Sequence, residues 1–173
     1  ILIKDTKGYI VVPKGHQHPN WLHILEQRLK KNIGDILLKR IIFLRFMSDL
    51  EYLALNSVSD VVLDTFPVGG GRSSYEIFSV DTPIVLLYPR TSILQLTTGM
   101  YKTMGFFDEN HMLSHHVITH TEEDFVTAAV EIANNETRQE LIRNLISQNK
   151  GRLYTSPSSC LALHIAFSSM ILS

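Results

Sequence analysis

The chain has 173 residues, 45% of them hydrophobic and 19% charged, which is enough apolar chain for one folded domain and excludes a disordered protein. Its 16 Lys and Arg residues and 17 Asp and Glu residues leave a formal net charge of −1, which argues against a nucleic-acid partner. The single cysteine excludes an intramolecular disulfide, and every apolar run is shorter than the roughly 20 residues of a membrane-spanning helix, so we expect no membrane partner.

Short apolar runs then alternate with amphipathic stretches along most of the chain. This alternation is typical of parallel strands joined by crossover helices, because such strands are buried on both faces and such helices on one. The apolar runs predict strands at residues 9–12, 41–44, 61–63, 84–87 and 117–119. We therefore expect an α/β domain with a parallel sheet and helices on both of its faces.

Between these strands, apolar residues recur at helical spacing. They predict helices near residues 21–29, 48–55, 73 onward, 93–104, 122–133 and 135–150. Ser48 followed by Glu51 is typical of a capping box, and Thr121 is placed to cap the helix that follows it. Gly151 comes directly after the last of these helices, where it predicts a left-handed C-cap.

The elements suggest one domain over residues 1–155 and a separate apolar helix over residues 156–173. The chain starts at Ile1, without an initiator Met or the pattern of a signal peptide, and we expect it to be a piece of a longer protein. The low cysteine content fits a reducing compartment, so we expect a cytoplasmic location.

Three consecutive glycines, Gly69, Gly70 and Gly71, stand between a predicted strand and a predicted helix. Each glycine carries an entropic cost on folding, so a run of three suggests that the backbone approaches a ligand closely. Ligands of parallel sheets bind beyond the carboxyl ends of the strands, where a helix N-terminus offers N–H groups to an anion. The spacing matches neither the usual dinucleotide fingerprint nor a P-loop.

The residues after these glycines carry suitable groups for a nucleotide. Arg72, Ser73 and Ser74 would add a positive charge and two hydroxyls beside a diphosphate, and Glu76 would suit the hydroxyls of a ribose. The spacing leaves an alternative open, in which Ser73 and Glu76 form a capping box and the glycines make an ordinary turn.

Six segments of the sequence also carry a resemblance to a known family. They are similar to the C-terminal half of the O-linked N-acetylglucosamine transferase and SPINDLY family, over about residues 8–154 and most densely over 60–85. The segments are residues 40–43, 52–55, 59–71, 73–76, 81–85 and 101–105.

The resemblance implies a Rossmann-like domain that forms one half of a glycosyltransferase-B fold. It implies a nucleotide-sugar donor and inverting transfer to Ser or Thr hydroxyls of proteins, without metal or further cofactor. UDP-N-acetylglucosamine is the donor that we expect first, and GDP-fucose users share the motif. The partners would be a protein acceptor and an N-terminal domain of the same enzyme, without which this chain would transfer nothing.

Residue by residue, the resemblance places the diphosphate at residues 70–74 and the ribose at Glu76. The backbone around Met47, from residue 46 to residue 48, matches the segment that lines the base. Arg72 stands where the family usually has Asn or Thr, and Gln95 stands where it typically has Arg, with Arg90 nearby. The phosphate-binding Lys of the family lies upstream of Gly8, and the resemblance assigns it to neither Lys4 nor Lys7 in particular.

Two other classes of function fit parts of the sequence. A hydrolase would use Ser73 or Ser74 as nucleophile with His120 and Asp124 as partners, although the glycine that follows such a nucleophile is missing. A non-catalytic nucleotide-binding or protein-interaction module would keep the glycine loop without turnover.

Histidines gather in two places. His111, His115, His116 and His120 lie within ten positions, but no cysteine supports them, so we expect exposed loop residues rather than a metal site. Residues 16 and 18 are also histidines, in a polar loop at the carboxyl end of the first predicted strand, and a solvated loop is their simplest interpretation.

Overall fold

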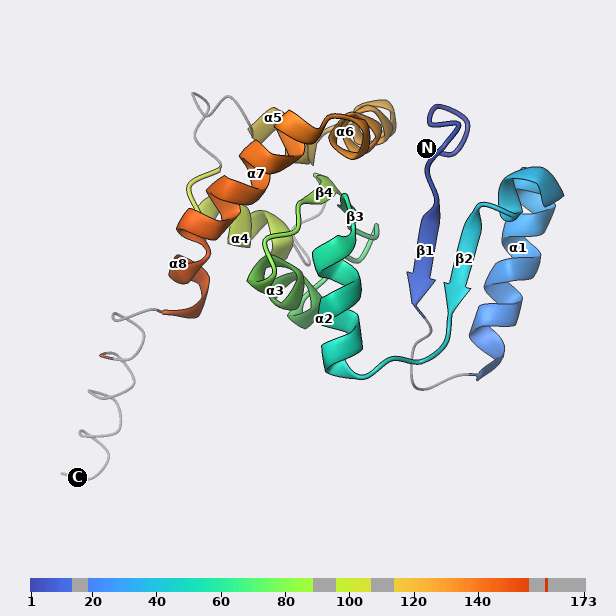
Figure 1. Ribbon diagram of the computed structural model, residues 1–173, viewed down its shortest axis with the longest axis horizontal. Coiled ribbons are helices and arrows are strands. Elements are labelled where there is room, and N and C mark those ends of the chain that lie inside the picture. The colour runs from blue at the N-terminus through green and yellow to red at the C-terminus, as the bar shows by residue number, and fades with distance from the viewer. Residues whose placement is uncertain (14–18, 89–95, 107–113, 156–160, 162–173) are drawn as a thin grey trace.

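A computed structural model describes residues 1–13, 19–88, 96–106, 114–155 and 161 (Figure 1). Strands and helices alternate from β1 to β4, as the sequence predicts, and two helices come between β4 and β5. The elements are β1 (Ile10–Pro13), α1 (Pro19–Leu38), β2 (Ile41–Leu44), α2 (Asp49–Val58), β3 (Val62–Leu63), α3 (Arg72–Ser79), β4 (Ile84–Leu87), α4 (Leu96–Thr103), α5 (Ser114–Val117), β5 (Ile118–Thr119), α6 (Glu122–Asn134), α7 (Glu136–Asn149) and α8 (Gly151–Tyr154).

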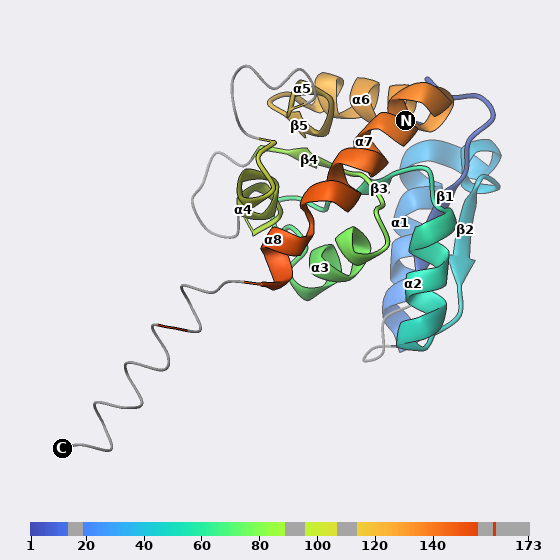
Figure 2. The ribbon, with the colours of Figure 1, turned by 60° about the vertical axis from the view of Figure 1, so that its left-hand side comes forward.

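All strand pairs are parallel, but the described strands form two sheets rather than one. β1 pairs with β2, while β3, β4 and β5 form a second ladder in that order. β3 is only two residues long, and its backbone bonds go to β4, with the Val62 N–H donating to the Pro83 carbonyl oxygen (2.8 Å). Figures 1 and 2 show β1 beside β3, so the two sheets lie next to each other. Among the described residues no ladder of backbone hydrogen bonds joins them.

The core is built around β4. Ile84, Val85 and Leu86 are almost completely buried there, because helices lie on both sides of the strand. Figures 1 and 2 show α6 on one side of β3 and β4 and α3 on the other. The buried Tyr101 joins α4 to β4, since its hydroxyl donates to the Ile84 carbonyl oxygen (2.8 Å) and accepts from the Ile84 N–H (2.9 Å). This rigid centre positions the loops at the strand ends.

The N-terminal segment, residues 1–8, connects the two sheets. The guanidinium of Arg40, just before β2, donates to the carbonyl oxygens of Leu2 (2.8 Å) and Asp5 (2.7 Å). From the same segment, Lys4 Nζ donates to Thr127 Oγ1 on α6 (2.7 Å). The segment is therefore attached to β2 on one side and to the helical layer over β4 on the other.

Two of the three predicted caps are confirmed. At α2 the Glu51 N–H donates to Ser48 Oγ (3.3 Å) and the Ser48 N–H donates to Glu51 Oε2 (2.8 Å), which completes the capping box. At α6 the Asp124 N–H donates to Thr121 Oγ1 (3.1 Å).

The left-handed cap predicted at Gly151 is wrong. Lys150 keeps right-handed helical angles (φ −57°, ψ −27°), and Gly151 opens α8 instead. The backbone continues helically at this point, since the Lys150 N–H donates to the Ile146 carbonyl oxygen (2.7 Å) and the Leu153 N–H donates to the Lys150 carbonyl oxygen (2.8 Å).

Some predictions fall outside the described residues. They are the apolar segment 156–173, apart from residue 161, and the beginning of the helix expected from residue 93. Within the described ranges, no helix combines the length and the apolar character needed to cross a membrane.

Candidate functional site

The loop between β3 and α3 folds around the carboxylate of Asp64. Asp64 Oδ1 accepts hydrogen bonds from the Gly70 N–H (2.7 Å) and the Thr65 N–H (3.1 Å). A Cβ atom added at Gly69 would lie 2.9 Å from Asp64 Oδ2, which is too close for a side chain. The loop therefore needs glycine first because its backbone passes too close to the Asp64 side chain to leave room for a Cβ atom.

A second close approach fixes Gly70. A Cβ atom there would lie 2.3 Å from Ser74 Oγ and 3.0 Å from Ser73 Oγ. The hydroxyl of Ser74 is buried and hydrogen-bonded to Thr97 Oγ1 on α4 (2.9 Å), and Thr97 Oγ1 lies 3.4 Å from the Gly70 carbonyl oxygen. Ser74 thus joins the glycine loop to α4, while Ser73 is only half-buried at the start of α3.

The start of α3 keeps unpaired backbone donors. Gly71 is the N-cap and makes no side-chain cap, and the first helical N–H with an acceptor is that of Ser74, bonded to the Gly71 carbonyl oxygen (3.0 Å). Among the described residues no acceptor pairs with the N–H groups of Gly71, Arg72 or Ser73. Together with the helix dipole, three such groups can bind an anion.

The alternative capping box of Ser73 and Glu76 is wrong. Glu76 Oε1 instead accepts a hydrogen bond from Arg72 Nε (2.6 Å). The same guanidinium reaches Asp49 Oδ2 at the start of α2 (3.4 Å), so it bridges two helices. The hydrogen bond that Arg72 donates to Glu76 raises the pKa of Arg72, and burial together with the charge of Glu76 raises the pKa of Tyr52 on α2.

The turn that carries Met47 lies next to this bridge. Met47 is half-buried and precedes Ser48, the N-cap of α2, while Asp49 is the first residue of that helix. The contact of Asp49 with Arg72 therefore brings the Met47 turn to the start of α3. The structure places the predicted base-lining and phosphate-binding segments side by side.

Sequence reasoning missed three residues of this site: Asp64, Asp49 and Thr97. Asp64 had a detectable signal, because it follows a buried strand directly and precedes the glycines. Asp49 and Thr97 had no such signal in the sequence. Asp49 contacts Arg72 across 23 positions, and Thr97 contacts Ser74 and Gly70 across 23 and 27 positions.

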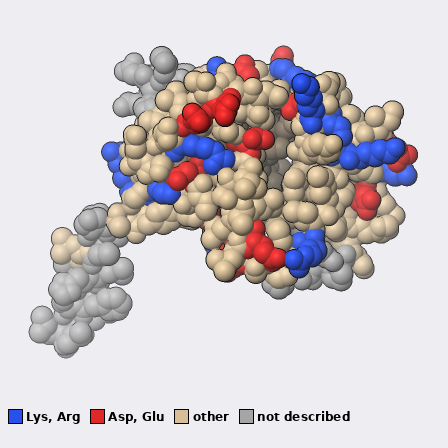
Figure 3. Space-filling model, viewed as in Figure 1, with Lys and Arg blue, Asp and Glu red and all other residues tan. Residues whose placement is uncertain are grey.

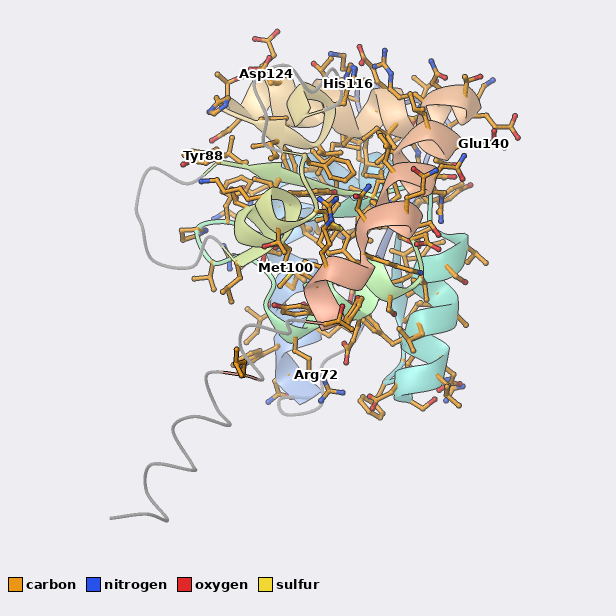
Figure 4. The ribbon with its side chains drawn as sticks, turned by 90° about the vertical axis from the view of Figure 1, so that its left-hand side faces the viewer. Arg72, Tyr88, Met100, His116, Asp124 and Glu140 are labelled. Atoms are coloured by element: carbon orange, nitrogen blue, oxygen red, sulfur yellow. The ribbon has the colours of Figure 1, made fainter. Side chains whose placement is uncertain are left out.

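The residues nominated for a hydrolase do not come together. Figure 4 shows Asp124 and Arg72, the neighbour of Ser73, at opposite ends of the molecule. Asp124 accepts from the Thr121 hydroxyl (2.7 Å) in the cap of α6, and the ring of His120 lies against Tyr88 (5.3 Å between centroids). A nucleophile, base and acid in mutual contact are required for this chemistry, so the hydrolase interpretation is abandoned.

The histidine groups fall largely outside what the structure describes. Residues 16, 18 and 111 are not described, nor is the side chain of His115. In the remaining parts of the chain, no three His, Cys, Asp or Glu side chains are placed to hold one metal ion.

Charge around the start of α3 is local and mixed. Two carboxylates, those of Asp49 and Glu76, contact the guanidinium of Arg72, and a third, that of Asp64, accepts from the Gly70 N–H in the adjacent loop. On the face shown in Figure 3, Lys and Arg side chains are interspersed with Asp and Glu side chains. Recognition of an anion here would depend on the directed N–H groups and on Arg72 rather than on a broad positive field.

The fold is α/β, with parallel strands flanked by helices, in the Rossmann-like arrangement of one half of a glycosyltransferase-B fold. Among solved structures, a mutant O-GlcNAc transferase of Thermobaculum terrenum is similar to it with a TM-score of 0.75 and 18% sequence identity. The similarity covers 97% of this chain and 31% of that chain, so this chain spans less than a third of its structural neighbour. No family model and no curated protein matches the sequence.

Proposed function

We propose that the chain is the nucleotide-sugar-binding part of an inverting protein O-glycosyltransferase. The observation that supports this most is the start of α3, where N–H groups without an acceptor among the described residues follow a glycine loop at the carboxyl end of a parallel strand. The similarity of fold to an O-GlcNAc transferase supports the same class of enzyme. UDP-N-acetylglucosamine is the donor that we propose first.

In this proposal the diphosphate lies against the N–H groups of residues 71–73 and the side chain of Arg72. Glu76 accepts hydrogen bonds from the ribose hydroxyls, and the turn around Met47 lines the base. Departure of the nucleoside diphosphate leaves negative charge on the phosphate oxygens. Donors that are already directed at that position stabilise the charge without reorganising, which lowers the barrier to transfer.

The acceptor side of the reaction belongs to other parts of the enzyme. A Ser or Thr hydroxyl of a protein would attack the anomeric carbon from the face opposite the leaving diphosphate, which inverts its configuration. The acceptor site and the base that takes the hydroxyl proton would come from an N-terminal domain. We therefore expect this chain alone to bind nucleotide weakly and to transfer no sugar.

Thermal unfolding with nucleotides tests the proposal. At a concentration about a hundredfold above Kd, UDP or GDP should stabilise the fold by about 2.7 kcal/mol, which raises the Tm of a chain of this size by about 5–10 °C. Glu76→Ala should abolish the protection, because the ribose loses its acceptor. The matched control is Glu140→Ala on α7, an exposed carboxylate that lies far from Arg72 in Figure 4 and should keep the protection.

A non-catalytic interaction module is the second candidate. It is favoured by the bond from the Gly70 N–H to Asp64, which takes one loop donor away from any ligand. If neither UDP nor GDP raises the Tm at millimolar concentration, the transferase proposal is contradicted and the module is preferred.

A further inference from the structure

The side chain of Arg72 lies across the start of α3 and contacts carboxylates on two helices. Its Nε donates to Glu76 Oε1 one turn further along α3 (2.6 Å), and its Nη2 lies 3.4 Å from Asp49 Oδ2 (Figure 4 labels Arg72). Helix energetics do not favour a cation at this place, because the N-terminal end of a helix carries partial positive charge. An Arg four residues before a Glu is also the weaker orientation of this pair. The two carboxylates therefore hold the guanidinium there.

One oxygen of the carboxylate proposed to bind the ribose is consequently occupied. Glu76 Oε1 accepts from Arg72, and the Glu76 side chain is only 27% exposed, against 78% for Arg72. The charge of Glu76 contributes to the raised pKa of Tyr52 on α2. A ribose hydroxyl that binds this same oxygen of Glu76 has to replace Arg72 as the hydrogen-bond donor.

A nucleoside and a nucleoside diphosphate differ in what they offer the displaced guanidinium. A nucleoside supplies hydroxyl donors for Glu76 and nothing for Arg72. A nucleoside diphosphate also supplies phosphate oxygens, which a guanidinium binds through parallel N–H bonds. Because the Arg72 side chain is largely exposed, its bond to Glu76 is weakly held and is readily exchanged for a phosphate.

We infer that Arg72 makes this site select nucleoside diphosphates over nucleosides. In the empty protein Arg72 donates a hydrogen bond to Glu76 Oε1. When a diphosphate binds the guanidinium, this bond breaks and Glu76 Oε1 accepts a hydrogen bond from the ribose instead. The inference rests on the proposed function and adds to it the group that couples ribose recognition to the diphosphate.

Titration of the full chain with UDP, GDP, uridine and guanosine tests the inference, by calorimetry for the diphosphates and by ligand-observed NMR for the weaker nucleosides. In Arg72→Thr the nucleoside should bind several-fold more tightly and the diphosphate several-fold more weakly, so the ratio of their affinities should fall by about tenfold or more. Added salt should strengthen nucleoside binding to the wild-type protein, because salt screens the ion pair that blocks Glu76, and this effect should vanish in Arg72→Thr.

The matched control is Lys30→Thr, which removes an exposed cation paired with Asp35 on α1 (2.9 Å) and should leave the affinity ratio unchanged. Circular dichroism verifies that both variants are folded. If a diphosphate binds the wild-type protein and the ratio is the same in Arg72→Thr, the inference is overturned while the proposed function stands. If no diphosphate binds either protein, both are overturned.

Discussion

At the scale of single residues, Asp64 has two opposing effects on the candidate site. Its carboxylate accepts the N–H groups of Gly70 and Thr65 and so gives the glycine loop its shape. The same negative charge lies beside the place proposed for a diphosphate and repels it. The shape of the loop and its affinity for an anion are therefore set by the same side chain.

Two substitutions separate these effects. Asp64→Asn keeps an oxygen that accepts from Gly70 and removes the charge, so UDP or GDP should bind several-fold more tightly with little change in Tm. Asp64→Ala removes the acceptor of two backbone N–H groups and should destabilise the fold by about 1.5–3 kcal/mol, or roughly 3–10 °C in Tm. Thermal unfolding and nucleotide titration of both variants measure the two effects. An Asp64→Ala protein with the same Tm as Asp64→Asn would contradict the structural role of the carboxylate.

At the scale of elements, the boundaries that could be predicted are those with local causes. Residues 84–87 were predicted as a strand and form β4 without any shift, because an apolar run of this length is dictated by burial on both faces. The capping box of α2 was predicted because Ser48 and Glu51 meet within one turn. Gly151 was misjudged because a further helical turn, α8, follows α7 directly, and a glycine after a helix does not by itself show that the chain leaves the helix there.

The candidate site was predictable to a similar degree. The glycine loop and the start of α3 follow from the order of strand, glycines and helix. The contacts between Arg72 and Asp49 and between Ser74 and Thr97 do not, because they depend on how α2, α3 and α4 pack. Packing of separate elements is what a single sequence specifies least directly.

The capping box of α2 predicts a pH-dependent stability. Hydrogen bonds from the backbone and side chain of Ser48 hold the pKa of Glu51 below its ordinary value of 4.5. A lowered pKa in the folded state means that the charged carboxylate stabilises the fold above about pH 4.5, and that this contribution is lost as the pH falls through the folded-state value. Denaturation by urea should therefore show a difference between wild type and Glu51→Gln at pH 7 that shrinks as the pH is lowered through the folded-state pKa of Glu51.

Ser48→Ala is the companion variant. It should lower the free energy of unfolding by about 1 kcal/mol, because the helix loses its N-cap. This loss should persist at neutral pH in a Glu51→Gln background. A Ser48→Ala protein as stable as wild type would contradict the role of the cap.

At the scale of the whole molecule, the described strands form two separate ladders, and the N-terminal segment joins them. Arg40 holds this segment against β2, and Lys4 holds it against α6. The apolar periodicity of the sequence could not reveal this division, because it reports which faces are buried and not which strand edges pair. The layer of β1, β2 and α1 should therefore be able to open while β4 stays closed.

Arg40→Met should produce this partial opening. The variant removes a guanidinium that is bonded to the carbonyl oxygens of Leu2, Asp5 and Gly8, and should be less stable by about 1.5–3 kcal/mol. Hydrogen exchange should accelerate in β1 and β2 while β4 keeps its protection. Lys39→Met, which removes the exposed cation next to it, should exchange like wild type, and uniform acceleration over all strands in Arg40→Met would contradict the division.

The attachment of the N-terminal segment also sets an order of events during translation. Lys4 and Thr127 are 123 positions apart, and Asp5 bonds to Asn134 across 129 positions. The residues that leave the ribosome first in this chain therefore wait for more than a hundred others before their final partners exist. Throughout that interval the hydrogen bonds that join residues 1–8, and with them β1 and β2, to α6 cannot form.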